Sequence, residues 1–187
     1  MIYHPSMTIE PEVWLRGPVE GVPAELMPAA HALLQTLEDV EHAASGLTRD
    51  QLWRSVGGAP SVGFHLLHLD GSTDRLLTYA RGERLSTDQK TALAAEQAPS
   101  ALDAATLVAR LRSRIEATLA ALREVPVGTV YEGRTVGRAA LPTTVIGLLF
   151  HAAEHSQRHA GQVVTTAKIV RGLDPKAWSP AQVEGGA

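Results

Sequence analysis

Apolar residues recur at intervals of three and four along most of the chain, which is the spacing of an amphipathic helix. Four long segments show this pattern, at about residues 23–44, 61–82, 100–125 and 143–171. A shorter segment at 86–96 opens with Ser86 and Gln89 in the positions of a capping box. The pattern predicts an all-α protein, built as an up-down four-helix bundle with a short extra helix.

Proline and glycine interrupt the pattern in three places. They predict an irregular arm at residues 1–22, a long connection at 125–142 with a brief hairpin, and a C-terminal tail at 172–187. A chain of 187 residues fits one domain. We therefore expect a single domain over residues 1–187, with the helical bundle at 23–171.

The last predicted helix carries His151, His155 and His159 at successive spacings of four, so that the three share a helix face. Eight residues of helix rise about 12 Å, which is too far for all three to bind one ion. An adjacent pair would therefore need a ligand from elsewhere. His65 and His68, in the second predicted helix, supply one. The sequence predicts a metal site between these two helices.

Further polar residues accompany the two histidine clusters. His31 and Glu38 share a stripe of the first helix; we interpret it as a solvated face, although either residue would help to orient a ligand if the stripe faced the histidines. Arg75 continues the stripe of His65 and His68, and Arg158 precedes His159. Arg75 and Arg158 are therefore candidates for contact with an anionic substrate.

The arginines of the third long helix are too dispersed to serve one site. We interpret them as a solvated surface rather than an anion clamp; they are Arg110, Arg112 and Arg114.

The segment from His151 to His155 also matches the H-x-x-E-H motif of inverted zinc peptidases. Only about thirty residues follow, whereas such an enzyme needs a further carboxylate and a body that holds a peptide. Glu154 lies roughly 100° around the helix from His155, and so does not point to the same ion. We reject the peptidase interpretation and keep Glu154 only as a candidate for an outer position beside the ligands.

The composition excludes several partners and chemistries. The formal charge of −3 comes without blocks of like charge, which argues against nucleic acid and anionic membranes as partners. The chain has no cysteine, so it has no thiolate ligand or cysteine nucleophile and suits a reducing compartment. No apolar stretch is long enough to span a bilayer. We expect a soluble, cytoplasmic protein with no membrane partner.

The histidine motifs resemble those of the DinB/YfiT-like superfamily of four-helix bundle metalloproteins. The resemblance covers residues 23–171 and is strongest over the segments 61–68 and 155–162. It implies one ligand from the second helix and an H-x-x-x-H pair from the fourth, here His68, His155 and His159. His65 and His151 are additional; one of them would be an outer partner or a substitute ligand. Ala160 stands where the family commonly has arginine.

The superfamily includes S-transferases that use bacillithiol or mycothiol, a thiol-dependent isomerase, and many proteins without known activity. The resemblance therefore implies a divalent metal, zinc or nickel, a low-molecular-weight thiol, a small-molecule substrate and a homodimer. The lack of cysteine fits a nucleophile that is brought in from outside. Two alternatives stay open: a metal-dependent hydrolase acting through metal-bound hydroxide, and a non-catalytic metal- or ligand-binding stress protein.

Overall fold

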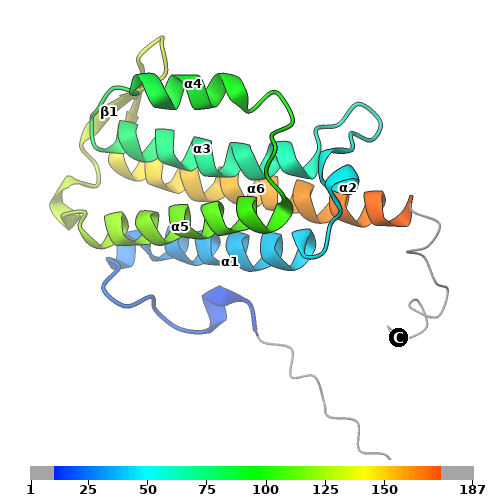
Figure 1. The fold of residues 1–187 in the computed structure, drawn as a ribbon. Helices are drawn as coiled ribbons and strands as arrows, with labels where there is room; N and C mark the ends of the chain where they lie inside the picture. Colours follow the sequence, from blue (N-terminus) through cyan, green and yellow to red (C-terminus); the bar gives the residue numbers. More distant parts are fainter. Residues whose placement is uncertain (1–10, 174–187) are drawn as a thin grey trace, which may run out of the picture.

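The computed structural model describes residues 11–173, so most of the predicted tail and the first ten residues of the arm lie outside the described residues. Four long helices lie side by side (Figure 1). They are α1 (Met27–Ala44), α3 (Val62–Ala80), α5 (Ala104–Arg123) and α6 (Val145–Gly172). The predicted all-α bundle is confirmed.

Short elements connect and cover the four long helices. They are α2 (Arg49–Trp53), α4 (Thr87–Ala95), 3-10 turns at Val13–Leu15, Ala24–Leu26 and Val127–Thr129, and an antiparallel hairpin of β1 (Gly133–Val136) and β2 (Leu141–Thr144). The hairpin falls in the connection where one was expected. We did not predict α2, because five residues are too few to show a helical period. Its signal is a capping box formed by Thr48 and Gln51.

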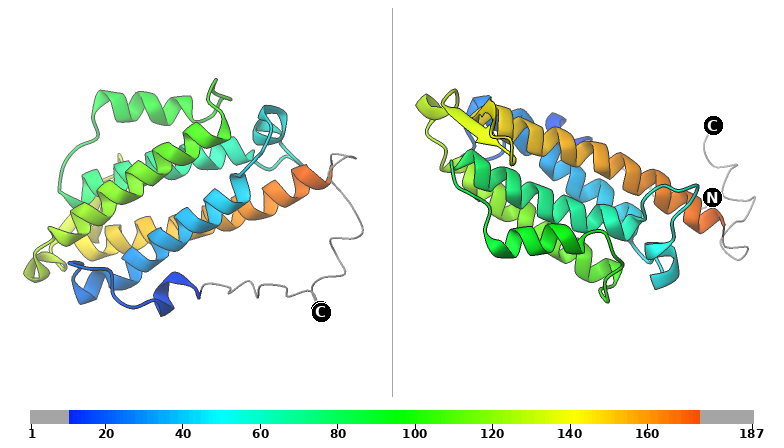
Figure 2. Two further views of the ribbon diagram at one scale, coloured as in Figure 1. Left: turned by 60° about the horizontal axis from the view of Figure 1, so that its bottom comes forward. Right: turned by 90° about the horizontal axis from the view of Figure 1, so that it is seen from above.

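The four helices do not simply alternate in direction. The helix α4 runs back along the outside of α3, so α5 starts at the same end of the bundle as α3 and runs parallel to it (Figures 1 and 2). Ion pairs confirm the register, since Asp70 contacts Arg110 while Asp74 contacts Arg114. The predicted up-down alternation therefore holds from α1 to α3 and from α5 to α6, but not from α3 to α5. The helix α6 lies between α1 and α3, and runs antiparallel to α3.

Leucine, valine and isoleucine fill the centre of the bundle. Side chains that are at most 1% exposed come from all four long helices, and include Leu33, Val40, Leu66, Leu69, Leu111, Ile115 and Val163. Between residues 11 and 173, no helix combines the length and the apolar character that a membrane span requires.

Polar side chains fix where the two histidine-bearing helices begin. Ser61 caps α3 by accepting a hydrogen bond from the amide of Phe64, and Thr144 caps α6 by accepting one from Gly147. The start of α5 differs from the prediction at Ser100. Asp103 is the N-cap there, because its carboxylate accepts from the amide of Thr106. The histidines therefore have fixed heights along α3 and α6.

Arg110 and Arg112 of α5 are solvated as predicted, with side chains 51% exposed, but the arginines of α5 also form ion pairs with neighbouring helices. Arg114 contacts both Asp70, at 3.0 Å, and Asp74, at 2.5 Å, and Arg110 contacts Asp70 at 2.9 Å. Arg112 pairs with Glu41 of α1. These arginines therefore join α5 to its two neighbours, which residue spacing alone could not show.

Two glycines give a matched test of the packing. A Cβ added to Gly63, in the first turn of α3, would lie 2.5–2.7 Å from the ring of Trp53. We expect Gly63→Ala to lower the free energy of unfolding by about 1–3 kcal/mol, because the rigid indole must move. Urea unfolding, followed by tryptophan fluorescence, measures this.

The control is Gly161→Ala in α6, where an added Cβ would meet nothing within 4 Å. This change should raise stability by about 0.4–1 kcal/mol, because alanine favours the helix. If both variants gained stability, the contact between Gly63 and Trp53 would not constrain the fold.

Candidate metal centre

The antiparallel helices α3 and α6 bring the two histidine clusters together. His68 Nε2 lies 3.0 Å from His155 Nε2, and His65 Nδ1 lies 3.0 Å from His159 Nδ1. The spacing of three in α3 and of four in α6 keeps each pair on one helix face. The structure thus places four of the five predicted histidines in direct contact.

His68, His155 and His159 offer one nitrogen each, and these three atoms all lie within 4.8 Å of one another. A tetrahedral ion with metal–nitrogen bonds of about 2.1 Å separates its ligands by roughly 3.4 Å. Small side-chain rotations would therefore bring the three rings onto one ion. The three are half-buried, and the side chain of His68 is 21% exposed, so the cluster reaches solvent.

His68 forms a hydrogen bond through Nδ1 with a carboxylate that the sequence analysis missed. Glu96, the C-cap residue of α4, places Oε2 2.8 Å from His68 Nδ1. A carboxylate can only accept, so His68 donates its Nδ1 proton and leaves the Nε2 lone pair free for a cation. Metal-binding histidines characteristically have such a carboxylate partner.

Arg75 and Gly71 keep Glu96 in this position. The guanidinium of Arg75 donates to Glu96 Oε1 at 2.6 Å, and the two side chains are buried. A Cβ at Gly71 would lie 2.3 Å from the same oxygen, so only glycine leaves room for the carboxylate. Arg75 therefore supports a histidine partner, and its burial argues against the predicted contact with substrate.

The imidazoles are not satisfied by the protein alone. His155 Nδ1 is buried and has no hydrogen-bond partner among the described residues. His68 and His155 face each other through Nε2 atoms, and because His68 carries its proton on Nδ1, one lone pair at least points into the cluster. His155 Nε2–H can donate to that lone pair when no metal is bound, and a cation would take the place of the shared proton. The residues present therefore fit a divalent metal with imidazole ligands.

Burial and the neighbouring rings keep His65, His155 and His159 neutral. Loss of hydration and the neighbouring imidazoles His159 and His68 lower the pKa of His65 to about 4. Burial first, and then His159 and His68, lower the pKa of His155 to about 4; burial and then His68 lower the pKa of His159. Neutral imidazole is the form that binds metals, so His155 and His159 need not lose protons near pH 7.

Glu96 stays ionised inside the bundle. Burial by itself would raise its pKa, but hydrogen bonds from His68 and Arg75 and the charge of Arg75 outweigh burial, and the pKa of Glu96 is lowered. The ionised carboxylate is therefore available as an acceptor for His68.

Three further candidates lie on the outer side of α6. The exposed ring of His151 lies 5.4 Å from that of His155, centroid to centroid, and its Nδ1 lies 3.4 Å from a carboxylate oxygen of Glu154. Glu154 also pairs with Arg158. His65, by contrast, is buried behind His159. His65 and not His151 therefore touches a member of the triad through a ring nitrogen.

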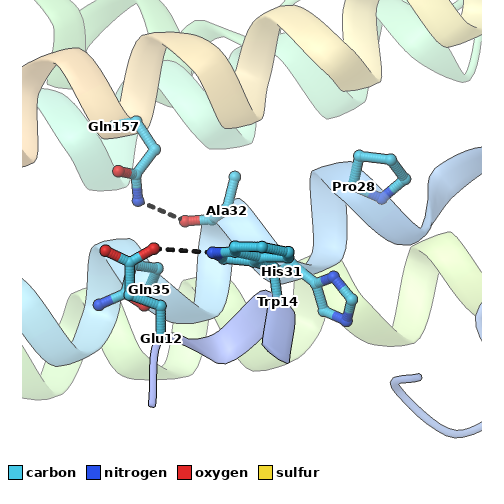
Figure 3. Close-up of a pocket in the computed structure, with 7 residues that line it drawn as sticks. All are labelled: Glu12, Trp14, Pro28, His31, Ala32, Gln35 and Gln157. Carbon is cyan, nitrogen blue, oxygen red and sulfur yellow. Dashed lines mark hydrogen bonds between the residues drawn. The ribbon is translucent and has the colours of Figure 1, made fainter. Parts of the chain in front are cut away.

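His31 does not reach the histidine cluster. Its Nε2 lies 2.9 Å from the carbonyl oxygen of Gly17, and the residue lines a cavity of about 450 Å³ between the arm and α1. Figure 3 shows this cavity, with Trp14 beside His31 and with Gln157 of α6 bonded to the carbonyl of Ala32. The condition under which His31 would orient a ligand is not met, because its stripe of α1 faces the arm and not the histidines.

Glu38 lies on the same stripe of α1. It pairs with Arg16 of the arm at 2.5 Å, and so it does not orient a histidine of the cluster either.

The lowered pKa of buried His65 predicts acid sensitivity of the metal-free protein. An unfolded histidine has a pKa of about 6.5, so between pH 6.5 and 4 the unfolded chain binds more protons and stability falls as pH falls. For His65 the slope approaches about 1.4 kcal/mol per pH unit. Urea unfolding of chelator-treated protein at pH 7 and 5 measures this. His65→Asn should show a smaller loss; an equal loss would contradict the assignment.

Comparison with known proteins agrees with the histidine motifs. Residues 32–163 match the family model described as the DinB superfamily, and this range includes the four contacting histidines and Glu96. No curated protein gives a significant match to the chain. The family match covers well over half of the sequence, and the chain therefore belongs to the DinB superfamily.

Proposed function

We propose that this protein binds a divalent metal through His68, His155 and His159 and uses it to transfer a low-molecular-weight thiol to a small molecule, or to isomerise one. The observation that carries the proposal is the convergence of three imidazoles from two helices, whose ligand nitrogens lie within 4.8 Å of one another. The anchoring of His68 by Glu96 supports it, because it fixes the ring proton on Nδ1 and directs the Nε2 lone pair toward the other histidines.

The donor set suits zinc and nickel alike, since imidazole is a good ligand for both. Three neutral ligands leave the ion its full charge and leave a coordination position for an outside group. When bound, such an ion supplies Lewis acidity and favours the deprotonated form of a thiol. The chain itself holds the ligands and excludes water from their inner side.

The sulfur must come from outside the chain, which has no cysteine. In a transfer, the thiol sulfur forms a bond to an electrophilic carbon, the leaving group departs with its electron pair, and the thiol proton passes to solvent. Arg158 is exposed on α6 directly before His159. We assign it to contact an anionic group of the thiol. This contact would replace part of the ion pair between Arg158 and Glu154.

The first test is metal content. Wild-type protein, loaded with zinc or nickel and desalted, should retain about one equivalent per chain by elemental analysis. His155→Ala should retain much less, because two imidazoles hold an ion far more weakly than three.

His42→Ala is the matched control for this test. His42 is an exposed histidine of α1, outside the cluster, so its removal should leave the metal content unchanged. Equal metal content in the wild type and in His155→Ala would remove the proposed site.

The second test separates transfer from the alternatives. Metal-loaded protein should accelerate the reaction of monochlorobimane with at least one of a panel of small thiols, and chelation should abolish the acceleration. Arg158→Ala should raise KM for an anionic thiol several-fold with little change in kcat. Metal binding without acceleration for any thiol would contradict the transferase and favour hydrolysis, tested with ester substrates, or a binding-only protein.

A further inference from the structure

The helix α4 docks on the bundle without an apolar anchor. None of the residues of Thr87–Ala95 is buried, and its leucine, Leu93, is 41% exposed. Apolar burial, which holds the four long helices together, therefore contributes little to the position of α4.

Polar contacts at its two ends hold α4 against α3 instead. At the start, Gln89 Nε2 donates to Asp74 Oδ2 at 2.7 Å and to Thr78 Oγ1 at 2.8 Å. At the end, Glu96 contacts His68 at 2.8 Å and Arg75 at 2.6 Å. Glu96 is 4% exposed, so this second contact is the buried one.

We propose that Glu96 is a positioning residue for the metal ligand His68, and that docking of α4 and binding of the metal are thermodynamically coupled. The inference rests on the proposed metal site. Glu96 does not bind the ion in this scheme. It orients the ring of His68, fixes the proton on Nδ1 and links the end of α4 to the site.

The coupling follows from the chemistry of imidazole. A cation on Nε2 withdraws electron density from the ring, which makes the Nδ1 proton a stronger donor to the carboxylate of Glu96. The ion therefore strengthens the contact that holds the end of α4. Because coupling free energies are reciprocal, a docked α4 must raise metal affinity by the same factor.

The contact between His68 and Glu96 is shielded and supported on its other sides. Phe64 stacks on the His68 ring with an interplanar angle of 6°, and Arg75 fixes the second carboxylate oxygen. Gly71 leaves the space that the carboxylate occupies. Phe64 thus holds the face of the His68 ring and Glu96 holds its Nδ1, while Arg75 and Gly71 keep Glu96 in place.

The main experiment is the change Glu96→Gln, which keeps the size of the side chain and removes its charge. Zinc affinity, measured by competition with a chromophoric chelator, should fall about 10- to 100-fold. Glu116→Gln, the same change at an exposed position of α5, should leave the affinity unchanged. The d–d absorption of cobalt-substituted protein should shift in Glu96→Gln only.

A second variant displaces Glu96 without altering it. A Cβ at Gly71 would lie 2.3 Å from Glu96 Oε1 and 2.6 Å from Arg75 Nη1, so Gly71→Ala should expel the carboxylate from its position. Alanine favours the helix, and α3 should therefore stay folded. Zinc affinity should fall to a similar extent as in Glu96→Gln, with circular dichroism unchanged.

Hydrogen exchange of α4 tests the reciprocal effect. In the wild type, zinc should slow exchange of the α4 amides, and in Glu96→Gln it should not. Gln89→Ala removes the other anchor without touching His68, so it should speed exchange while costing less zinc affinity than Glu96→Gln. An equal loss of affinity would mean that Glu96 acts only by holding α4, and would overturn its positioning role.

The results distinguish this inference from the proposed function. If the wild type binds no metal, the proposed metal site fails, and the coupling fails with it. If the wild type binds zinc but Glu96→Gln binds it equally well, or if zinc leaves α4 exchange unchanged, only the inference about Glu96 is overturned.

Discussion

The contact between α3 and α6 places a polar cluster inside a bundle that is otherwise held together by leucine, valine and alanine. Four imidazoles meet there in two pairs, each with nitrogens 3.0 Å apart. An unsatisfied buried polar group costs about 1–3 kcal/mol, so such a cluster is unfavourable unless its members find partners. Ser61 and Thr144, which fix the starts of the two helices, determine whether the pairs meet.

The protein supplies partners to the outer side of the cluster and leaves the inner side open. Glu96 takes the outer nitrogen of His68, and His65 contacts His159. Burial lowers the pKa of His65 and of His155, so these two rings remain neutral. Without a metal, one nitrogen of each pair can donate to the other, and a divalent cation would take the place of such a proton between His68, His155 and His159. The same neutral state is unfavourable in acid, since protonation would place like charges side by side.

The sequence predicts those parts of the molecule that follow a local rule. Spacings of three and four identified both histidine helices, and a capping box located the start of α4. Glu96 could not be found this way, because it lies 28 residues from His68 at the end of a helix with no apolar stripe. The neighbour of His31 could not be predicted for a related reason: periodicity shows that residues share a helix face, but not which part of the protein that face contacts. The direction of α5 depends on the path of α4, which no local pattern specifies.

The return path of α4 links the topology of the chain to its chemistry. The segment between α3 and α5 is the crossover that lets these two helices run parallel. The same segment contains Glu96 and places it against Nδ1 of His68. A redesigned bundle with a short turn in place of the crossover would reverse α5, and could keep an apolar interior. It would nevertheless lose the acidic residue that fixes the tautomer of one imidazole. In this protein, the connection between α3 and α5 therefore also determines which nitrogen of His68 carries the proton.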